Sequence, residues 1–319
     1  MTIPFRTALV TGGAGFIGHH IARTLLARGC NVRVLDDLSR GSRTRLTEIG
    51  AGVDFVEGSI LDDNALEKSV RGVDVIFHHG AWASVPQSVE QPIEYQEIDA
   101  TGTLKVLEAA RKLGVRRIVY AASSSAYGDQ PELPKREDQI PTPISPYAVA
   151  KYVGELYLSV YAKLHGMETI SLRYFNVFGP HQDPKSLYGA AIPAIVSRVV
   201  KGISPTIYGD GEQTRDFCYI DNVVEANLLA ASATGVAGQV VNVACGQRVS
   251  VNDIVRLANQ FLGTNVKPTY APPRVGDVKD SWADCSLAAK VIGYKPKVFF
   301  EEGLKRWIDW YKTSEYMRS

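Results

Sequence analysis

Residues 7–18, Thr7-Ala8-Leu9-Val10-Thr11-Gly12-Gly13-Ala14-Gly15-Phe16-Ile17-Gly18, decide the fold that we expect of this chain. An apolar strand-like run ends in a glycine turn, and a helical pattern over Phe16–Arg28 follows at once. Glycines at such a turn let the backbone approach a pyrophosphate, and the helix N-terminus offers unpaired N–H groups to it. The G-x-x-G-x-x-G spacing is a variant of the dinucleotide-binding fingerprint, so we expect a phosphate-binding turn at Gly12, Gly15 and Gly18.

An acid at the end of the second expected strand supports this interpretation. Asp36 directly follows the expected strand Asn31–Leu35. In dinucleotide-binding folds, a carboxylate at the end of the second strand binds the hydroxyls of the adenosine ribose. Negative charge there disfavours a 2′-phosphate, so the expected cofactor is NAD rather than NADP, although Arg40 and Arg43 are close in sequence. The alternative is a tight turn followed by a solvated acid. The order and spacing of strand, glycines, helix and acid favour the cofactor.

The first half of the chain alternates short apolar runs with longer amphipathic stretches. This alternation predicts an α/β fold, a doubly wound parallel sheet of the Rossmann type with helices on both faces. The rhythm changes after Asn176, so we expect an NAD-binding domain over 1–175 and a smaller α/β substrate domain over 176–319, with the chain rejoining the sheet at roughly 215–245. The expected strands are Thr7–Thr11, Asn31–Leu35, Asp54–Glu57, Val73–His78, Arg117–Ala122, Thr169–Tyr174 and Pro205–Tyr208. The expected helices are Phe16–Arg28, Leu61–Val70, Thr101–Leu113, Pro146–His165, Ile192–Lys201, Asp221–Ala231, Asn252–Phe261 and Glu301–Tyr311.

The composition excludes several other classes of protein. The 319 residues carry 35 basic and 34 acidic side chains, a net charge of +1, so we expect no nucleic-acid partner and no membrane anchor. No run reaches the ~18 apolar residues of a spanning helix, and the start leaves no room for a signal peptide. Four scattered cysteines predict reduced thiols in a cytoplasmic protein. Six histidines without metal-binding spacing predict no zinc site.

A second constellation of residues points to proton transfer. Arg117–Ala122 leads into Ser123, and the carboxyl ends of parallel strands face the ligand crevice. Tyr147 and Lys151 are four residues apart on one face of the expected helix Pro146–His165. A cation at that distance favours phenolate, so we expect it to lower the pKa of Tyr147 from about 10. Each motif alone is common on protein surfaces. After a cofactor-binding turn, however, the two motifs together indicate that Tyr147 exchanges a proton with the substrate. Ser123 would then hold the substrate oxygen, and Lys151 would bind the nicotinamide ribose.

These motifs together resemble those of the extended short-chain dehydrogenase/reductases. They are residues 11–18, Ser123–Gly128, Ser145-Pro146-Tyr147 with Lys151, and residues 173–180. Within that superfamily the chain is most similar to the UDP-hexose (UDP-glucose / UDP-N-acetylglucosamine) 4-epimerases. The resemblance implies an isomerase in which Tyr147 takes the proton of the sugar 4-hydroxyl while a hydride passes to NAD. The 4-keto sugar then turns and accepts the hydride on its other face.

The resemblance also assigns residues to the two ligands. Ser124 and Ser125 stand where 4,6-dehydratases have an Asp-Glu pair and decarboxylases a glutamate, which favours simple epimerisation. The implied cofactor-binding residues are Gly12, Gly15, Phe16, Ile17, Gly18, Asp36, Ser59, Ile60, Tyr147, Lys151 and Tyr174. The implied substrate-binding residues are Ser84, Ser123, Ser124, Ser125, Tyr147, Asn176, Ala191, Ile192, Ile207, Tyr208, Arg215, Arg274, Asp277 and Ser281.

One position is expected to select the sugar. Epimerases limited to UDP-glucose and UDP-galactose have a tyrosine before Trp-Ala-Asp, and this chain has Ser281 there. The smaller side chain leaves space for a 2-N-acetyl group, so we expect activity on UDP-GlcNAc and UDP-GalNAc alongside the unsubstituted sugars. Three positions depart from the family pattern: Ser59 replaces an adenine-binding acid, Asp99 an asparagine, and Ala83 a lysine near the nicotinamide.

Two other functions stay open at this point. The small pocket residue and extra polar groups also suit a UDP-hexuronate 4-epimerase. A non-catalytic NAD-binding regulator of the same fold is the other alternative, and the intact Ser123, Tyr147 and Lys151 argue against it. The resemblance further implies a homodimer formed through Thr101–Leu113 and Pro146–His165, although an apolar face there equally suits core packing.

Overall fold

The computed structural model describes residues 3–182, 191–273 and 279–318, so Arg274 and Asp277 lie outside the described residues. Within this part of the chain, seven strands form one sheet in the order β11-β6-β5-β4-β1-β2-β3, and every neighbouring pair is parallel. This order confirms the doubly wound α/β fold, whose direction of winding reverses between β1 and β4. The strands are β1 (Thr7–Thr11), β2 (Asn31–Asp36), β3 (Val53–Glu57), β4 (Val75–His78), β5 (Arg117–Ser123), β6 (Glu168–Tyr174) and β11 (Gln239–Val243).

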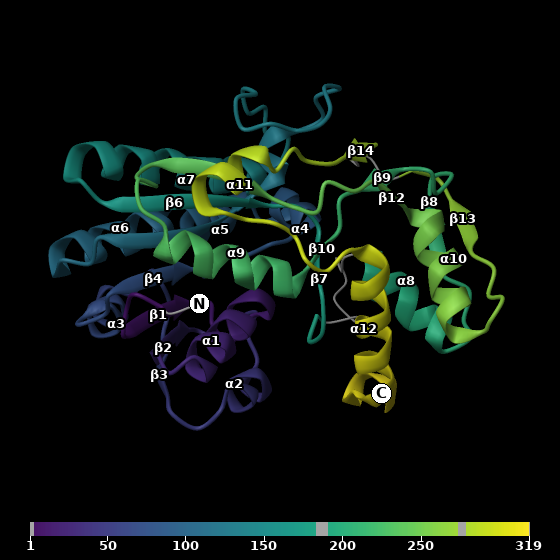
Figure 1. Cartoon of the computed structure of the whole chain (residues 1–319), viewed down its shortest axis with the longest axis horizontal. Coiled ribbons are helices and arrows are strands. Elements are labelled where there is room, and N and C mark those ends of the chain that lie inside the picture. Colours follow the sequence, from purple (N-terminus) through teal and green to yellow (C-terminus); the bar gives the residue numbers. More distant parts are fainter. Residues whose placement is uncertain (1–2, 183–190, 274–278, 319) are drawn as a thin grey trace.

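Helices cover both faces of this sheet (Figure 1). One face packs against α1 (Phe16–Ala27) and α9 (Ile220–Ser232), and the other against α3 (Asp63–Val70), α6 (Gly102–Leu113) and α7 (Pro146–His165). Because both faces are buried, β4 and β5 are apolar along most of their length, whereas β6 alternates, with its polar residues Thr169, Ser171 and Arg173 also buried. Two separate apolar cores result, one on each side of the sheet.

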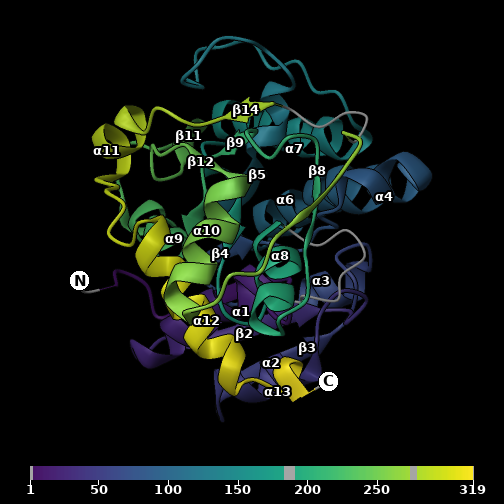
Figure 2. The same cartoon turned by 90° about the vertical axis from the view of Figure 1, so that its right-hand side faces the viewer.

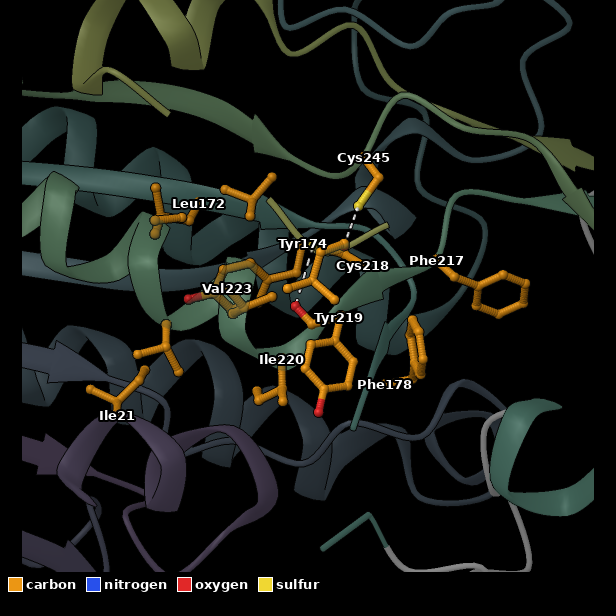
Figure 3. Close-up of a cluster of buried hydrophobic side chains, with 14 of the residues drawn as sticks. Ile21, Leu172, Tyr174, Phe178, Phe217, Cys218, Tyr219, Ile220, Val223 and Cys245 are labelled. Carbon is orange, nitrogen blue, oxygen red and sulfur yellow. Dashed lines mark hydrogen bonds between the residues drawn. The ribbon is translucent and has the colours of Figure 1, made fainter. Parts of the chain in front are cut away.

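The larger core continues from the sheet into the second half of the chain. Figure 3 shows Ile21 of α1 and Leu172 of β6 near side chains from β7 (Val177–Phe178), β10 (Cys218–Tyr219) and the first turns of α9. Phe178 packs edge-on against Tyr219, with ring centroids 5.5 Å apart. The two halves of the chain therefore share one apolar interior.

The second half places most of its remaining elements beside the sheet, at the right of Figure 1. There α8 (Ala191–Val200), α10 (Val251–Leu262) and α12 (Phe300–Thr313) pack together, as Figure 2 shows from the side. β8 (Thr206–Tyr208) pairs with β13 (Thr269–Ala271), and β9 (Thr214–Arg215) lies between β12 (Val249–Ser250) and β14 (Asp280–Ser281). The short helices α11 (Ser286–Ile292) and α13 (Glu315–Arg318) complete this half.

Several elements were not expected from the sequence. α2 (Arg43–Ile49) has little apolar periodicity, and α4 (Val85–Glu90) and α5 (Pro92–Tyr95) are short segments that begin beside prolines. They lead into a π-helical turn, η1 (Gln96–Thr101), which continues as α6. The strand β11 was expected only as a return of the chain to the sheet at roughly 215–245.

Two further expectations can be compared with the structure. Cys30, Cys218, Cys245 and Cys285 are all free thiols, as their scattered positions predicted. Among the described residues, no helix combines the length and the apolar character that a membrane crossing requires.

Candidate active site

The glycine turn after β1 is closed to side chains. Gly12 has φ +67°, and a Cβ there would lie 2.6 Å from the backbone oxygen of His79. A Cβ at Gly18 would lie 2.2 Å from the backbone oxygen of Gly12, so the first turn of α1 packs directly on the turn that precedes it. Gly15 is the N-cap of α1 and has no side chain to occupy the first N–H groups of the helix. The turn therefore presents backbone donors and a helix N-terminus to a groove, which suits a pyrophosphate.

The groove beside this turn gathers residues from four neighbouring strand ends. Its lining includes five of the predicted cofactor-binding residues: Gly12, Gly15, Asp36, Ser59 and Ile60. Phe16, Ile17 and Gly18 form the first turn of α1 directly behind it. The groove lies at the carboxyl ends of β1, β2, β3 and β4, which is where doubly wound folds bind their ligands. The residues present thus fit a bound dinucleotide.

Asp36 is tied to the glycine turn by two backbone hydrogen bonds. Its Oδ2 accepts from Ala14 N at 2.9 Å, and its Oδ1 accepts from Leu38 N at 2.8 Å. Burial raises the pKa of Asp36, while these two hydrogen bonds lower it. The carboxylate thus fixes the shape of the turn in addition to lining the groove. Arg40 also lines the groove and stacks 4.6 Å from the Trp82 ring, whereas Arg43 contacts Glu57.

Ser123, Tyr147 and Lys151, the tyrosine–lysine cluster, come together where β5 ends and α7 begins. Ser123 is the last residue of β5, and its Oγ accepts hydrogen bonds from Ser125 N at 3.2 Å and Ser125 Oγ at 2.8 Å. Ser123 lies close enough to Tyr147 for its hydroxyl to lower the pKa of the phenol. Lys151, one turn further along α7, is buried with its Nζ 4.5 Å from the centre of the Tyr120 ring. The sequence prediction that these three residues meet is consistent with this arrangement.

The sequence predicts that Lys151 lowers the pKa of Tyr147, but in the structure this pKa is raised. Burial raises the pKa of Tyr147 above its usual value, and Asp99 and Tyr95 raise it further. The Ser123 hydroxyl lowers the pKa of Tyr147, but by less than these effects raise it. Spacing on a helix could show that a cation is near, but not that desolvation of the phenol outweighs it. The prediction that the pKa of Tyr147 is lowered was therefore wrong.

Asp99 is a buried carboxylate of this cluster that sequence reasoning recognised only as a departure from the family pattern. Its Oδ1 accepts a hydrogen bond from Trp82 N at 2.8 Å, while its Oδ2 has no hydrogen-bond partner among the described residues. Burial raises the pKa of Asp99 to about 7, and the charge of Lys151 opposes this shift. Burial lowers the pKa of Lys151, and the carboxylates of Asp99 and Glu155 oppose that.

A second carboxylate, Glu155, lies one turn beyond Lys151 on α7. It forms a buried two-point ion pair with Arg173 of β6, at 3.0 Å and 2.8 Å. The Arg173 guanidinium lies 4.6 Å from the centre of the Tyr127 ring, and the Tyr127 hydroxyl donates to Asn242 of β11 at 2.7 Å. This chain of contacts connects α7 with three adjacent parts of the sheet and holds the helix that carries the cluster.

Two tyrosines extend the cluster toward other predicted residues. The Tyr95 ring packs edge-on to Tyr147 at 6.3 Å, and its hydroxyl accepts a hydrogen bond from Ser84 N at 3.1 Å. Tyr95 is a contact that the sequence did not reveal, because no motif surrounds it. The Tyr174 hydroxyl is hydrogen-bonded to His79 Nε2 at 2.9 Å, and His79 lines the groove.

The predicted substrate residues of the second half fall into two groups. Ser281 pairs in register with Arg215 across β14 and β9, so these two are neighbours. Two residues later, Ala283 packs in a small apolar cluster with Tyr127 and Phe175, close to the end of β5. Asn176 is exposed, with its Nδ2 donating to Asp216 O at 3.4 Å.

Ile192 and Ile207 are buried in the larger core, and Ile207 also pairs with Tyr270 between β8 and β13. Tyr208 is partly exposed beside Ile207, and Ala191 begins α8. Ser124 starts the short helical turn η2 (Ser124–Tyr127) after β5, next to Ser125.

With this geometry in view, the comparisons with known proteins are decisive at the level of the family. Residues 8–244 match the model of the NAD dependent epimerase/dehydratase family. The chain belongs to that family. The match covers the parallel sheet from the second residue of β1 to the end of β11, and membership agrees with NAD as the cofactor predicted from the glycine turn and Asp36.

Three members of this family illustrate its breadth. A putative UDP-glucose 4-epimerase of Methanocaldococcus jannaschii is 38% identical over 96% of this chain and 98% of its own length. The solved UDP-N-acetylglucosamine 4-epimerase from Methanobrevibacter ruminantium M1, in complex with UDP-N-acetylmuramic acid, is 37% identical with a TM-score of 0.92, over 96% of this chain and 98% of that one. The solved Thermus thermophilus UDP-glucose 4-epimerase, in complex with NAD, is 36% identical with a TM-score of 0.88, over 97% of this chain and 99% of that one.

Proposed function

We propose that this protein catalyses the 4-epimerisation of UDP-hexoses through a transient 4-keto sugar. The observation that carries the proposal is the closeness of Tyr147, at the start of α7, to Ser123, at the end of β5, with Lys151 buried one turn further along α7. A phenolate beside a serine hydroxyl can take a proton from one alcohol and return it to the same oxygen. The names of the similar proteins described above support the same reaction class.

The proposed roles follow from the positions of the side chains. Tyr147 removes the proton from the sugar 4-hydroxyl, and Ser123 holds that oxygen while the charge develops. Lys151, whose charged form is favoured by the carboxylates of Asp99 and Glu155, stabilises the phenolate and binds the nicotinamide ribose. NAD, when bound, supplies the hydride acceptor. Asp36 and the glycine turn hold the cofactor, so it can stay bound between turnovers.

The serines after Ser123 favour epimerisation over elimination. Ser124 and Ser125 form the turn η2, and neither has a carboxyl group that could remove a proton from a neighbouring carbon. We further propose the division expected from the sequence, with 1–175 and roughly 215–245 binding the cofactor and the remainder of 176–319 binding the nucleotide sugar. Arg215, with its fork of donors, suits the diphosphate of that ligand.

A panel of UDP-sugars tests this function directly. The protein is incubated, without added reductant, with UDP-glucose, UDP-GlcNAc and UDP-glucuronate, and the products are separated. Epimers at the fourth carbon are the expected result with the first two substrates. Turnover of UDP-glucuronate alone would favour the uronate alternative, a 4-keto-6-deoxy product would indicate a dehydratase, and no change with any sugar would favour a non-catalytic regulator.

The sugar preference rests on the size of residue 281. Ser281 lies opposite Arg215 in β14, and a tyrosine there would take up the space that we assign to the 2-N-acetyl group. We expect Ser281→Tyr to lower kcat/KM for UDP-GlcNAc by roughly 10–200-fold, while UDP-glucose turnover changes little. Ser286→Tyr, in the nearby helix α11, is the control for added bulk. Unchanged turnover of the acetylated substrate by Ser281→Tyr would contradict the assignment.

The homodimer is proposed on the exposed face of α7. Val149, Leu156, Val160 and Leu164 are 43–72% exposed and lie along one side of this helix, with Val89 and Ile93 exposed on α4 and α5. Leaving such a stripe in water is unfavourable, so a second copy of the chain is the expected cover. Light scattering should give twice the chain mass for the natural protein and the monomer mass for Val160→Glu, with Ile203→Glu as the exposed control. A natural protein of monomer mass would contradict the proposal.

A further inference from the structure

His19, Glu48 and His181, the histidine cluster, are brought together from three separate parts of the chain. His19 belongs to α1, Glu48 to α2, and His181 to the segment after β7. Each offers one possible ligand atom, and the three atoms lie within 4.8 Å of one another. No sequence spacing could reveal this cluster, because its members are 29 and 133 residues apart (48 − 19 and 181 − 48).

The Glu48 carboxylate lies between the two imidazoles. Its Oε2 is 3.6 Å from His19 Nε2 and 3.0 Å from His181 Nδ1. A four-coordinate zinc ion with ligands at about 2.0–2.2 Å separates neighbouring ligand atoms by roughly 3.3–3.6 Å. The two distances from Glu48 are close to this range, so small side-chain movements would let all three atoms bind one ion.

His19 is the least satisfied member of the cluster. Its side chain is fully buried, and neither ring nitrogen has a hydrogen-bond partner among the described residues. A buried polar group without a partner is costly, and a bound ion is one of the few ways to satisfy it. His20, its neighbour, differs in this respect because its Nε2 contacts Pro180 O at 2.9 Å.

We propose that His19, Glu48 and His181 form a binding site for a divalent transition-metal ion of the zinc type. Two imidazoles and one carboxylate are a ligand set that zinc accepts, with water completing the coordination. This inference does not depend on the proposed epimerase activity, and it replaces the sequence prediction of no zinc site.

The charges around the cluster are balanced rather than uniformly unfavourable. Arg23 and Arg45 face it from α1 and α2, and Glu315 faces Glu48 from α13. Two cationic and two anionic side chains, counting Glu48, therefore surround the site before an ion binds. The arginines weaken cation binding, so we expect a moderate affinity rather than that of a closed structural zinc site.

An ion at this position would clamp elements that hold the cofactor groove. Arg45 already links the cluster to the glycine turn, because it donates to His181 O at 2.9 Å and to Ala14 O at 3.3 Å. The His181 ring also packs 5.2 Å from Trp310 of α12. Bridging His19 to His181 would therefore fix the first turns of α1 against the C-terminal part of the chain.

Zinc titration of untagged, chelator-treated protein tests this site, because an oligohistidine tag would itself bind zinc. Calorimetry should give about one equivalent of Zn²⁺ per chain and at least roughly tenfold weaker binding by Glu48→Gln and by His181→Gln. These two positions are partly exposed, so the variants should fold, which circular dichroism checks. Glu67→Gln and His165→Gln, both at exposed positions, are the matched controls and should bind like the natural chain.

Two further readouts keep the result unambiguous. Zinc at a hundredfold excess over its dissociation constant should raise the unfolding midpoint of the natural chain by roughly 3–5 °C, and not that of Glu48→Gln. Cobalt(II) bound to the natural chain should show the visible absorption of a low-coordinate complex. No binding by the natural chain, or undiminished binding by both Glu48→Gln and His181→Gln, would overturn the proposal.

Discussion

The tyrosine–lysine cluster and the histidine cluster differ in the charges that lie beside their buried titratable groups. In the first, Lys151 is buried beside the carboxylates of Asp99 and Glu155, which oppose the loss of its charge. In the second, burial and neighbouring arginines keep His19 and His181 neutral. The difference shows that burial alone does not decide protonation. The carboxylates beside Lys151 are themselves buried, whereas Glu48 beside the histidines is 36% exposed and is opposed by Arg23 and Arg45. The first arrangement suits proton transfer, and the second suits metal binding.

Replacing the phenol is expected to have the largest effect. Tyr147→Phe removes the proton acceptor and should lower kcat by roughly 10²–10⁴-fold or more, while NAD stays bound because the glycine turn and Asp36 are untouched. Turnover is measured with the best substrate of the UDP-sugar panel, and cofactor content by absorbance after denaturation. Tyr157→Phe, further along α7, is the control, and near-normal turnover by Tyr147→Phe would remove Tyr147 from the mechanism.

Acid should destabilise the protein through the histidine cluster. The pKa values of His19, His20 and His181 fall from about 6.5 to about 2, 3 and 4, mainly through burial. For groups with a lowered pKa, the stability they confer is complete above the unfolded pKa near 6.5 and is lost as the pH falls below it. Below that pH, each ring that stays neutral in the folded protein should lower the free energy of unfolding by about 1.4 kcal/mol for every unit that the pH falls.

His19→Gln tests this contribution. Between pH 6 and 4.5, in the presence of a chelator, the unfolding free energy of the variant should fall less steeply, by about 1.4 kcal/mol per pH unit. The slope of the unfolding free energy against pH is compared, because replacing a buried histidine with glutamine also changes the absolute unfolding free energy. His165→Gln is the control for the substitution itself, and an unchanged slope for His19→Gln would show that His19 does not stay neutral.

Of the substitutions Tyr147→Phe, His19→Gln and Asp99→Asn, the last should have the smallest effect. The Asp99 carboxylate raises the pKa of both Tyr147 and Lys151, so its removal lowers both. Both limbs of the pH profile of kcat/KM should therefore move to lower pH, by roughly 0.5–1 unit. The conservative asparagine keeps an acceptor for Trp82 N, so folding should be retained. A uniform loss of activity without a shift would point to a merely structural role.

Much of the fold could be predicted because its signals are local. The turn at residues 12–18 places glycine, helix start and strand end within a dozen residues, and Asp36 follows at a fixed spacing. Pro146–His165 was predicted with correct bounds because Ser145 caps the helix and Gly166 ends it. By contrast, β11 begins with an exposed glutamine after Gly238, so the short run does not stand out from a turn.

The candidate site likewise contains residues that the sequence predicted and residues that it did not. Ser123, Tyr147 and Lys151 lie at the ends of consecutive elements, so motif order was enough to bring them together. Tyr95 and the histidine cluster depend on how distant segments pack, which no spacing encodes. Likewise, the raised pKa of Tyr147 depends on desolvation by several elements at once, and sequence adjacency to Lys151 could not reveal it.

One isotope experiment tests the central claim most directly. A UDP-hexose carrying deuterium on its fourth carbon is incubated with the natural protein, and the epimer is examined by NMR. If the hydride leaves and returns to the same carbon while Tyr147 exchanges only the hydroxyl proton, the epimer retains the deuterium at that carbon. Loss of deuterium to solvent, or its transfer to another carbon, would contradict the account.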